Sequence, residues 1–168
     1  MELSILQIII LSIIQAVTEF LPISSSAHLL LPSKLLGWPD QGIIFDITVH
    51  FATLMAVLIY FRDEFLKLSF YFSKTFLFLV ISTLPIVFIV LFVEGIGDYR
   101  WSLTSIAYAN IFFALLLYIS EKTSQQKYSN SDMTAKHAIV IGLFQTLSLI
   151  SGASRSGTAI TGLSLIHI

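Results

Sequence analysis

The sequence "EFLPISSSAHLLL", residues 19–31, lies within the first apolar segment of the chain. The residues on both sides are almost all Ile and Leu, yet this stretch carries a carboxylate, a proline, three hydroxyls and an imidazole. Ionisable side chains are costly inside a bilayer and mark functional positions there. The stretch therefore predicts a break in a helix that brings polar side chains to membrane depth.

Composition places the chain in a membrane. The 168 residues are 56% hydrophobic and 11% charged, whereas soluble domains are about 25% charged. We expect an all-α integral membrane protein with a single membrane domain, 1–168. The net charge of −1 gives no reason to expect nucleic acid, and the absence of cysteine excludes disulfides and thiolate chemistry. Glu2 stands where a signal peptide is basic, so the first apolar run is expected to remain in the mature protein.

Three segments within 43–119 are long and apolar enough to cross a bilayer, which takes roughly 20 residues. They are Ile43–Phe61, Thr75–Val93 and Ser102–Ile119, and Pro85 is expected to kink the second. Polar stretches separate them, and the longest, "SEKTSQQKYSNSDMTAKH", reads as an exposed loop. The pattern predicts three full transmembrane helices.

The two ends, residues 1–36 and 138–166, are apolar runs interrupted by polar clusters. Each half is too short to cross alone, and irregular backbone at membrane depth needs protein or a water-filled cavity around it. We therefore predict two re-entrant helix-turn-helix hairpins. They align without gaps at an offset of 130: Gln15 with Gln145, Thr18 with Ser148, Ser24 with Ser154, Ser26 with Ser156 and Ala27 with Gly157.

Three spans between the hairpins would make them enter from opposite faces, as an inverted-topology repeat whose polar turns meet near the midplane. Cationic residues orient the chain through the positive-inside rule. One side would hold Lys34 and Arg100; the other would hold Arg62, Lys67, Lys74, Lys122, Lys127 and Lys136. The second side is therefore expected in the cytoplasm, with the first hairpin opening outward.

The second cluster, "SGASRSG", has the composition of a phosphate cradle. Arg155 offers a fixed fork for phosphate oxygens, small residues let the backbone approach a ligand, and a helix restarting near Ser156–Thr158 would add free N–H groups. The cluster could also be a small-residue turn for tight helix packing. We expect Arg155 to pair with Glu19, and an ion pair that merely joins the hairpins is the simpler alternative.

The first cluster, "SSSAH", offers hydroxyl nucleophiles beside an imidazole. His28 follows Ser25 by three residues and Ser24 by four, which places them on one face of a helix. A hydroxyl needs a neighbouring base, which could be Glu19 or His28, with His28 also a candidate acid for the leaving group. The serines could equally cap a helix.

Other buried polar residues give weaker signals. Gln15 and Glu19, at i and i+4, could hold a hard cation through oxygen ligands, although one carboxylate is a weak metal signature. Asp46 and His50 could line the cavity or bond to each other. Asn110 is expected to join helices, and His137 is expected in a loop without a special role.

Three segments together, "QAVTEFLPISSSAHL", "FDITVHFATLMAVLIYFRDE" and "SGASRSGT", resemble the bacterial undecaprenyl-diphosphate phosphatase family. The resemblance extends to about Gly162. It implies an inner-membrane, multi-pass enzyme that removes one phosphate from undecaprenyl diphosphate, recycles the lipid carrier of cell-wall synthesis and confers bacitracin resistance. It also implies inverted re-entrant repeats and a divalent cation (Mg²⁺ or Ca²⁺), while the orientation given above places the opening of the active site on the periplasmic face.

By this resemblance, Gln15 and Glu19 occupy the acidic motif, Ser25 is the proposed nucleophile beside Ser24, and His28 is the motif histidine. The phosphate-binding turn corresponds to Ser154, Arg155 and Ser156. Further candidate phosphate ligands are Ser24 and Ser26 in the first cluster and Gly157 and Thr158 in the second. The chain departs from the family at Ser151, where proline is usual, and at Ala159, where threonine is usual.

Family members continue for three further spans, so we expect this chain to be truncated, lacking the spans that mirror 43–119, and to fold poorly or act weakly alone. A phosphatase acting on a polyprenyl diphosphate is the favoured interpretation, with Ser25 or an activated water as nucleophile. A flippase or transporter is the alternative, because inverted repeats with broken helices are transporter architecture. A scaffold would leave the intramembrane charges unexplained. A homodimer is a further candidate assembly.

Overall fold

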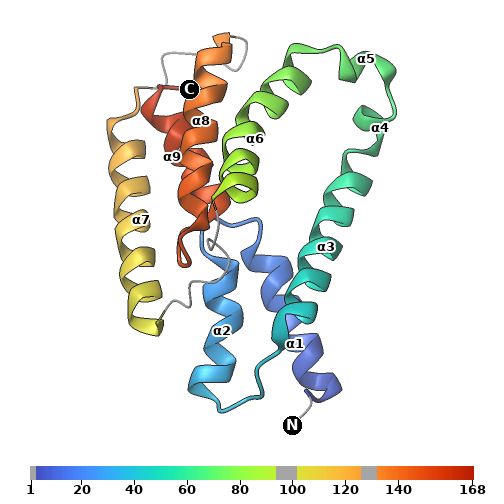
Figure 1. Cartoon of the computed structure of the whole chain (residues 1–168), viewed down its shortest axis with the longest axis vertical. Helices are drawn as coiled ribbons and strands as arrows, with labels where there is room; N and C mark the ends of the chain where they lie inside the picture. Colours follow the sequence, from blue (N-terminus) through green and yellow to red (C-terminus); the bar gives the residue numbers. More distant parts are fainter. Residues whose placement is uncertain (1–2, 94–101, 126–131) are drawn as a thin grey trace.

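The computed structural model describes residues 3–93, 102–125 and 132–168, and these residues form helices joined by turns. Figure 1 shows the arrangement. In chain order the elements are α1 (Ile5–Thr18), α2 (Ser25–Leu35), α3 (Gly42–Tyr60), α4 (Arg62–Phe65), α5 (Leu68–Tyr71), α6 (Lys74–Phe92), α7 (Leu103–Thr123), α8 (Ala135–Thr146), η2 (Leu147–Leu149) and α9 (Arg155–Leu165).

Helices α3, α6 and α7 contain 19, 19 and 21 residues, and each is long and apolar enough to cross a membrane. They confirm the three predicted spans, with bounds that differ by a few residues. Their most apolar windows are only 6–11% buried, so their hydrophobic surfaces face outward, as lipid-facing surfaces do. Helix α6 continues through Pro85.

The chain ends form two helical hairpins, α1 with α2 and α8 with α9. Their helices have 14, 11, 12 and 11 residues, so each is shorter than the roughly 20 residues of a full span. The bounds repeat the predicted offset: α1 and α8 begin at residues 5 and 135, and α2 and α9 occupy 25–35 and 155–165.

The second hairpin starts earlier than the predicted residue 138, and His137 is helical instead of lying in a loop. Thr134 caps α8 by accepting a hydrogen bond from the His137 backbone N–H. A capping hydroxyl satisfies a free N–H of the first turn and so extends a helix toward the polar side. Because this segment is polar, the sequence did not predict that first turn as part of the helix.

Packing gathers the short helices at the centre of the molecule. Helix α8 packs along α6, α9 packs against α7 and α8, and α1 packs against α2 and α3. Leu11, Leu29 and Val49 form a buried cluster that joins α1, α2 and α3. In Figure 1 the hairpin α1–α2 lies toward one end of the molecule and α8–α9 toward the other, with their breaks facing each other between them.

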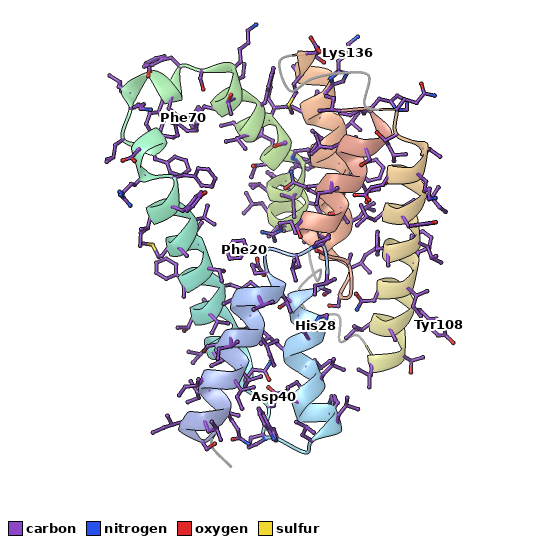
Figure 2. All side chains as sticks on the ribbon, turned by 180° about the vertical axis from the view of Figure 1, so that it is seen from behind. Phe20, His28, Asp40, Phe70, Tyr108 and Lys136 are labelled. Atoms are coloured by element: carbon purple, nitrogen blue, oxygen red, sulfur yellow. The ribbon has the colours of Figure 1, made fainter. Side chains whose placement is uncertain are left out.

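The cationic residues assigned to the second side lie toward one end of the molecule. In Figure 2 Phe70, on α5, and Lys136, at the start of α8, lie at one end, and Asp40 lies at the other. The cationic residues predicted for one side belong to α4, the α4–α5 connection, the first turns of α6 and α8 and the last turn of α7. Arg100 and Lys127 lie outside the described residues.

Candidate functional site

The breaks of the two hairpins meet. Ser156 Oγ donates a hydrogen bond to the Leu21 carbonyl oxygen at 2.8 Å, and Ser154 Oγ lies 2.9 Å from Ser156 Oγ and 3.5 Å from the same carbonyl. Phe20, at the first break, lies in the middle of the molecule in Figure 2. The predicted meeting of the two polar turns is therefore confirmed.

A cavity of about 100 Å³, here the central pocket, lies where the breaks meet. Serines from both hairpins surround it, together with a carboxylate, an imidazole and a guanidinium. Its lining is Glu19, Ile23, Ser24, Ser25, Ser26, His50, Ser148, Ala153, Ser154 and Arg155. The structure thus brings the predicted Ser25–Glu19 pair and the predicted phosphate-binding arginine to one cavity.

One carboxylate oxygen organises the pocket. Glu19 Oε2 accepts hydrogen bonds from Ser25 Oγ at 2.7 Å and from Gln15 Nε2 at 3.0 Å, and it lies 3.5 Å from His50 Nε2. A short O–H···O⁻ bond of this kind is among the stronger hydrogen bonds in proteins. The arrangement gives Ser25 a base within direct reach, as activation of a hydroxyl nucleophile requires.

Local structure explains why Glu19 and Ser25 face each other. Glu19 is the C-cap residue of α1, where its backbone N–H still bonds the Gln15 carbonyl. Ser24 is the N-cap of α2, because its hydroxyl accepts from the Ala27 N–H at 3.4 Å. The capping role predicted for the serines therefore belongs to Ser24. Ser25, the first residue of α2, keeps its hydroxyl for Glu19.

Arg155 begins α9 directly after its N-cap, Ser154. Its side chain is exposed and lines the central pocket. The expected Glu19–Arg155 ion pair is wrong for this structure: among the described residues, Glu19 pairs with His50, and its Oε2 is engaged by Ser25 and Gln15. The guanidinium is left available to an anion.

The turn before Arg155 depends on Gly152. Its φ is +103°, and a Cβ there would lie 2.6 Å from the Ile106 carbonyl oxygen of α7. L-residues rarely adopt this conformation, and the close approach leaves no space for a side chain. Gly152 therefore fixes the path that delivers Arg155 to the central pocket.

Several predicted residues lie outside the central pocket. His28 Nδ1 lies 2.7 Å from the Ser24 carbonyl oxygen, and the ring borders an apolar hollow between α1 and α2. Gly157 and Thr158 line a smaller cavity of about 50 Å³ against α7, where Thr158 Oγ1 donates to the Arg155 carbonyl. Ser156 is committed to Leu21. These residues lie outside the central pocket because of their positions around the axes of α2 and α9. Their catalytic and phosphate-binding roles stay predictions.

The structure adds two polar residues that the motifs did not single out for the site, His50 and Ser148. His50 was left between lining the cavity and bonding Asp46; it lines the pocket, and its Nδ1 lies 2.7 Å from the Asp46 backbone oxygen, while the Asp46 carboxylate accepts from Gln41. Ser148 entered the sequence analysis only as the repeat equivalent of Thr18, which was not a site candidate, so no sequence signal pointed to it. Its hydroxyl donates to the Gln145 carbonyl.

A larger hollow of about 580 Å³, here the apolar groove, joins the central pocket. The two share Glu19, His50 and Arg155. The rest of the groove is mainly hydrophobic and follows α3: its lining includes Phe20, Ile47, Phe51, Leu54 and Val57. A polar pocket that continues into a hydrocarbon-lined groove suits an amphipathic ligand with an anionic head.

The predicted cation ligands are close together. Gln15 is fully buried, its Nε2 bonds Glu19, and its Oε1 has no hydrogen-bond partner. A carbonyl oxygen and a carboxylate are the ligand chemistry of a hard cation such as Mg²⁺, although Gln15 is not among the residues that line the central pocket. Within residues 3–93, 102–125 and 132–168, no group of three or more His, Asp or Glu side chains could hold an ion.

Comparisons with known proteins agree with the geometry. The family described as "Bacitracin resistance protein BacA" matches residues 8–168. An undecaprenyl-diphosphatase of Alteromonas mediterranea is 44% identical over an alignment of 172 positions, which covers 95% of this chain and 65% of that protein. One from Campylobacter concisus is 44% identical, with 96% and 65% covered. Undecaprenyl-diphosphatase 1 of Pseudoalteromonas translucida is 42% identical, with 95% and 65% covered. The chain thus spans just under two thirds of these curated relatives.

Proposed function

The chain belongs to the bacitracin resistance protein BacA family, and on that premise we propose that it hydrolyses undecaprenyl diphosphate to undecaprenyl phosphate and inorganic phosphate. Its relatives carry the name undecaprenyl-diphosphatase. The observation that best supports this function is the central pocket, where a hydroxyl bonded to a carboxylate shares one cavity with an available guanidinium. The proposal includes a role in recycling the cell-wall lipid carrier and in bacitracin resistance.

Ser25 and Glu19 supply the nucleophile and the base. Ser25 Oγ attacks the terminal phosphorus, its proton passes to Glu19, and the bond to the bridging oxygen breaks. Undecaprenyl phosphate leaves with the electron pair of that bond. After Glu19 has lost its proton to solvent, it takes a proton from water, which attacks the phosphoserine, and passes this proton to Ser25 Oγ as phosphate departs. In the alternative, water attacks the substrate directly with Glu19 as base.

Arg155 binds the diphosphate and stabilises the charge of the transition state. Its guanidinium can bond two phosphate oxygens at once, and its place at the start of α9, a helix of 11 residues, adds the positive end of the helix dipole. Ser24, Ser26 and Ser154 line the same cavity and can donate further hydrogen bonds. These groups hold the substrate head beside Ser25.

The reaction does not require His28 as an acid. The leaving group is a phosphate monoester, whose last proton has a pKa near 6, so it departs as a stable anion. This chemistry agrees with the position of His28 outside the central pocket. His28 then serves α2 through its contact with the Ser24 carbonyl.

The apolar groove receives the polyprenyl tail. Its volume of about 580 Å³ is within the roughly 300–1,000 Å³ of small-molecule sites, which is room for the first part of a long tail whose remainder stays in the bilayer. Phe20, Phe51, Leu54 and Val57 line the groove, the last three along α3. The polar pocket positions the reacting phosphate, and the groove favours a substrate with a lipid tail.

A divalent cation, Mg²⁺ or Ca²⁺, would be held by Gln15 and Glu19. When bound, it would neutralise negative charge on the diphosphate. The buried, unpartnered Gln15 Oε1 supports this assignment. Phosphate release that falls with a chelator and returns with added Mg²⁺ would agree with it.

The hairpins are proposed to be re-entrant and related as an inverted repeat. Support comes from helices too short to span and from element bounds repeated at an offset of 130. By the positive-inside rule, the end that carries α4 and α5 faces the cytoplasm of the bacterial inner membrane, and the active site opens to the periplasmic side. A homodimer is part of this proposal only as a candidate assembly.

Phosphate release by the purified chain in lipid nanodiscs, with undecaprenyl diphosphate as substrate, tests the function. Glu19→Gln should lower kcat by about 10²–10⁴-fold, the usual contribution of a general base. Glu64→Gln is the matched control, because Glu64 pairs with Lys67 at 3.0 Å away from the site. No release by a wild-type chain that circular dichroism shows to be folded, or equal rates for wild type and Glu19→Gln, would refute the proposal.

A further inference from the structure

His50 reaches the candidate site from α3 and touches its central carboxylate. His50 Nε2 lies 3.5 Å from Glu19 Oε2, and the two side chains are 38% and 29% exposed. This distance exceeds the usual hydrogen-bond range of about 2.7–3.2 Å, so the contact is a close electrostatic approach. His50 also lines both the central pocket and the apolar groove.

The orientation of the ring is set within α3. His50 Nδ1 lies 2.7 Å from the Asp46 backbone oxygen. A carbonyl can only accept a hydrogen bond, so Nδ1 carries a hydrogen and Nε2 is the atom presented to Glu19. The Asp46 carboxylate is held by Gln41 Nε2 at 3.2 Å and is not the partner of the ring. A neutral ring with its hydrogen on Nδ1 has none on Nε2, so the contact with the Glu19 carboxylate is attractive when the ring carries a hydrogen on both nitrogens.

The other contacts of Glu19 Oε2 leave one side for His50. Gln15, one turn earlier on α1, and Ser25, at the start of α2, both donate to this oxygen. His50 is its contact from α3 among the described residues. Three elements therefore converge on the atom that would accept the Ser25 proton.

We propose that His50 is a positioning residue for this reaction: it holds the Glu19 carboxylate so that Oε2 stays in line with Ser25 Oγ. The inference rests on the proposed function. A misplaced base loses rate even when substrate binding is intact, because proton transfer depends on the short Ser25–Glu19 contact. His50 should thus affect kcat more than KM.

A purely structural role for His50 would predict that its replacement destabilises the fold. The Nδ1 atom is already satisfied within its own helix, and Leu11, Leu29 and Val49 hold α1, α2 and α3 together independently. Helix α3 therefore does not need Glu19 in order to fold. Replacement of His50 should leave the structure intact while it loosens the base.

The experiment compares His50→Leu, which has no donor, with His50→Gln, whose amide can still donate to Glu19. Thr48→Val is the control, because Thr48 Oγ1 bonds the Ile44 carbonyl on an exposed part of α3. Steady-state phosphate release from undecaprenyl diphosphate in nanodiscs gives kcat and KM for each variant. Thermal unfolding monitored by circular dichroism checks that each variant folds.

We expect His50→Leu to lower kcat about tenfold to hundredfold, because small misplacement of a catalytic group costs rates of this order, with KM changed by less than about threefold. His50→Gln should recover most of kcat, and Thr48→Val should match wild type. An unchanged kcat in His50→Leu, a rise in KM alone, or no recovery in His50→Gln would overturn the inference while the wild-type enzyme still turns over. An inactive wild-type chain would instead overturn the proposed function and the inference with it.

Discussion

Replacement of Ser25 by alanine separates the two nucleophiles that the site allows. Ser25 Oγ donates to Glu19 Oε2 at 2.7 Å, whereas no such bond to Glu19 exists for Ser26, which lines the same pocket. If Ser25 attacks phosphorus, Ser25→Ala removes both the nucleophile and its activated proton. We expect kcat for phosphate release to fall at least about 10²–10⁴-fold, equal to about 3–5 kcal/mol in activation free energy.

The neighbouring serines provide controls for this experiment. Ser26→Ala removes a hydroxyl from the same pocket and should cost less than about tenfold, the value of one neutral hydrogen bond. Ser25→Ala should fold, because the N-cap of α2 is Ser24 and alanine favours helices. Equal rates for the two variants would refute activation of Ser25, and near-normal turnover in Ser25→Ala would show that water is the nucleophile.

Two further predictions concern Arg155 and the turn that delivers it. Arg155→Lys keeps the charge but loses the two-pronged fork, so kcat/KM should fall roughly tenfold, and Arg155→Ala should fall roughly a further tenfold or more; steady-state kinetics with undecaprenyl diphosphate measure both, and a full-rate Arg155→Ala would exclude the phosphate-binding role. Gly152→Ala must accept φ near +103° and a Cβ 2.6 Å from the Ile106 oxygen. It should lower the free energy of unfolding by roughly 1–3 kcal/mol, visible as a lower melting temperature in detergent, and an unchanged melting temperature would contradict the packing of this turn on α7.

Apolar composition and helix-breaking residues were sufficient to predict the framework. The three spans follow from unbroken hydrophobic runs, and α3 and α6 begin and end within one residue of their predicted bounds. The two hairpins follow from polar clusters inside apolar runs, and their meeting was predicted from the inverted repeat that three intervening spans would give. These signals are local or compositional, so a single sequence carries them.

The partners of the individual site residues could not be predicted in the same way. His50 approaches Glu19 because α3 packs on α1, and the spacing between residues 19 and 50 carries no trace of that contact. The i,i+3 spacing of Ser25 and His28 suggested a pair, but the ring turns to the Ser24 carbonyl. Likewise, opposite charge suggested Glu19 with Arg155, although shorter contacts occupy Glu19. Tertiary packing decides among partners that are equally plausible in sequence.

The offset between the hairpins explains how the site combines two unlike groups. Ser24 and Ser154 cap equivalent helices, and the next residues, Ser25 and Arg155, are also equivalent at an offset of 130. A capping serine satisfies a free N–H of the first turn, which each hairpin needs wherever a helix restarts away from water. The residue after the cap begins the helix in both cases and lines the central pocket. The same backbone arrangement, used twice, therefore presents a hydroxyl from one hairpin and a guanidinium from the other to one cavity.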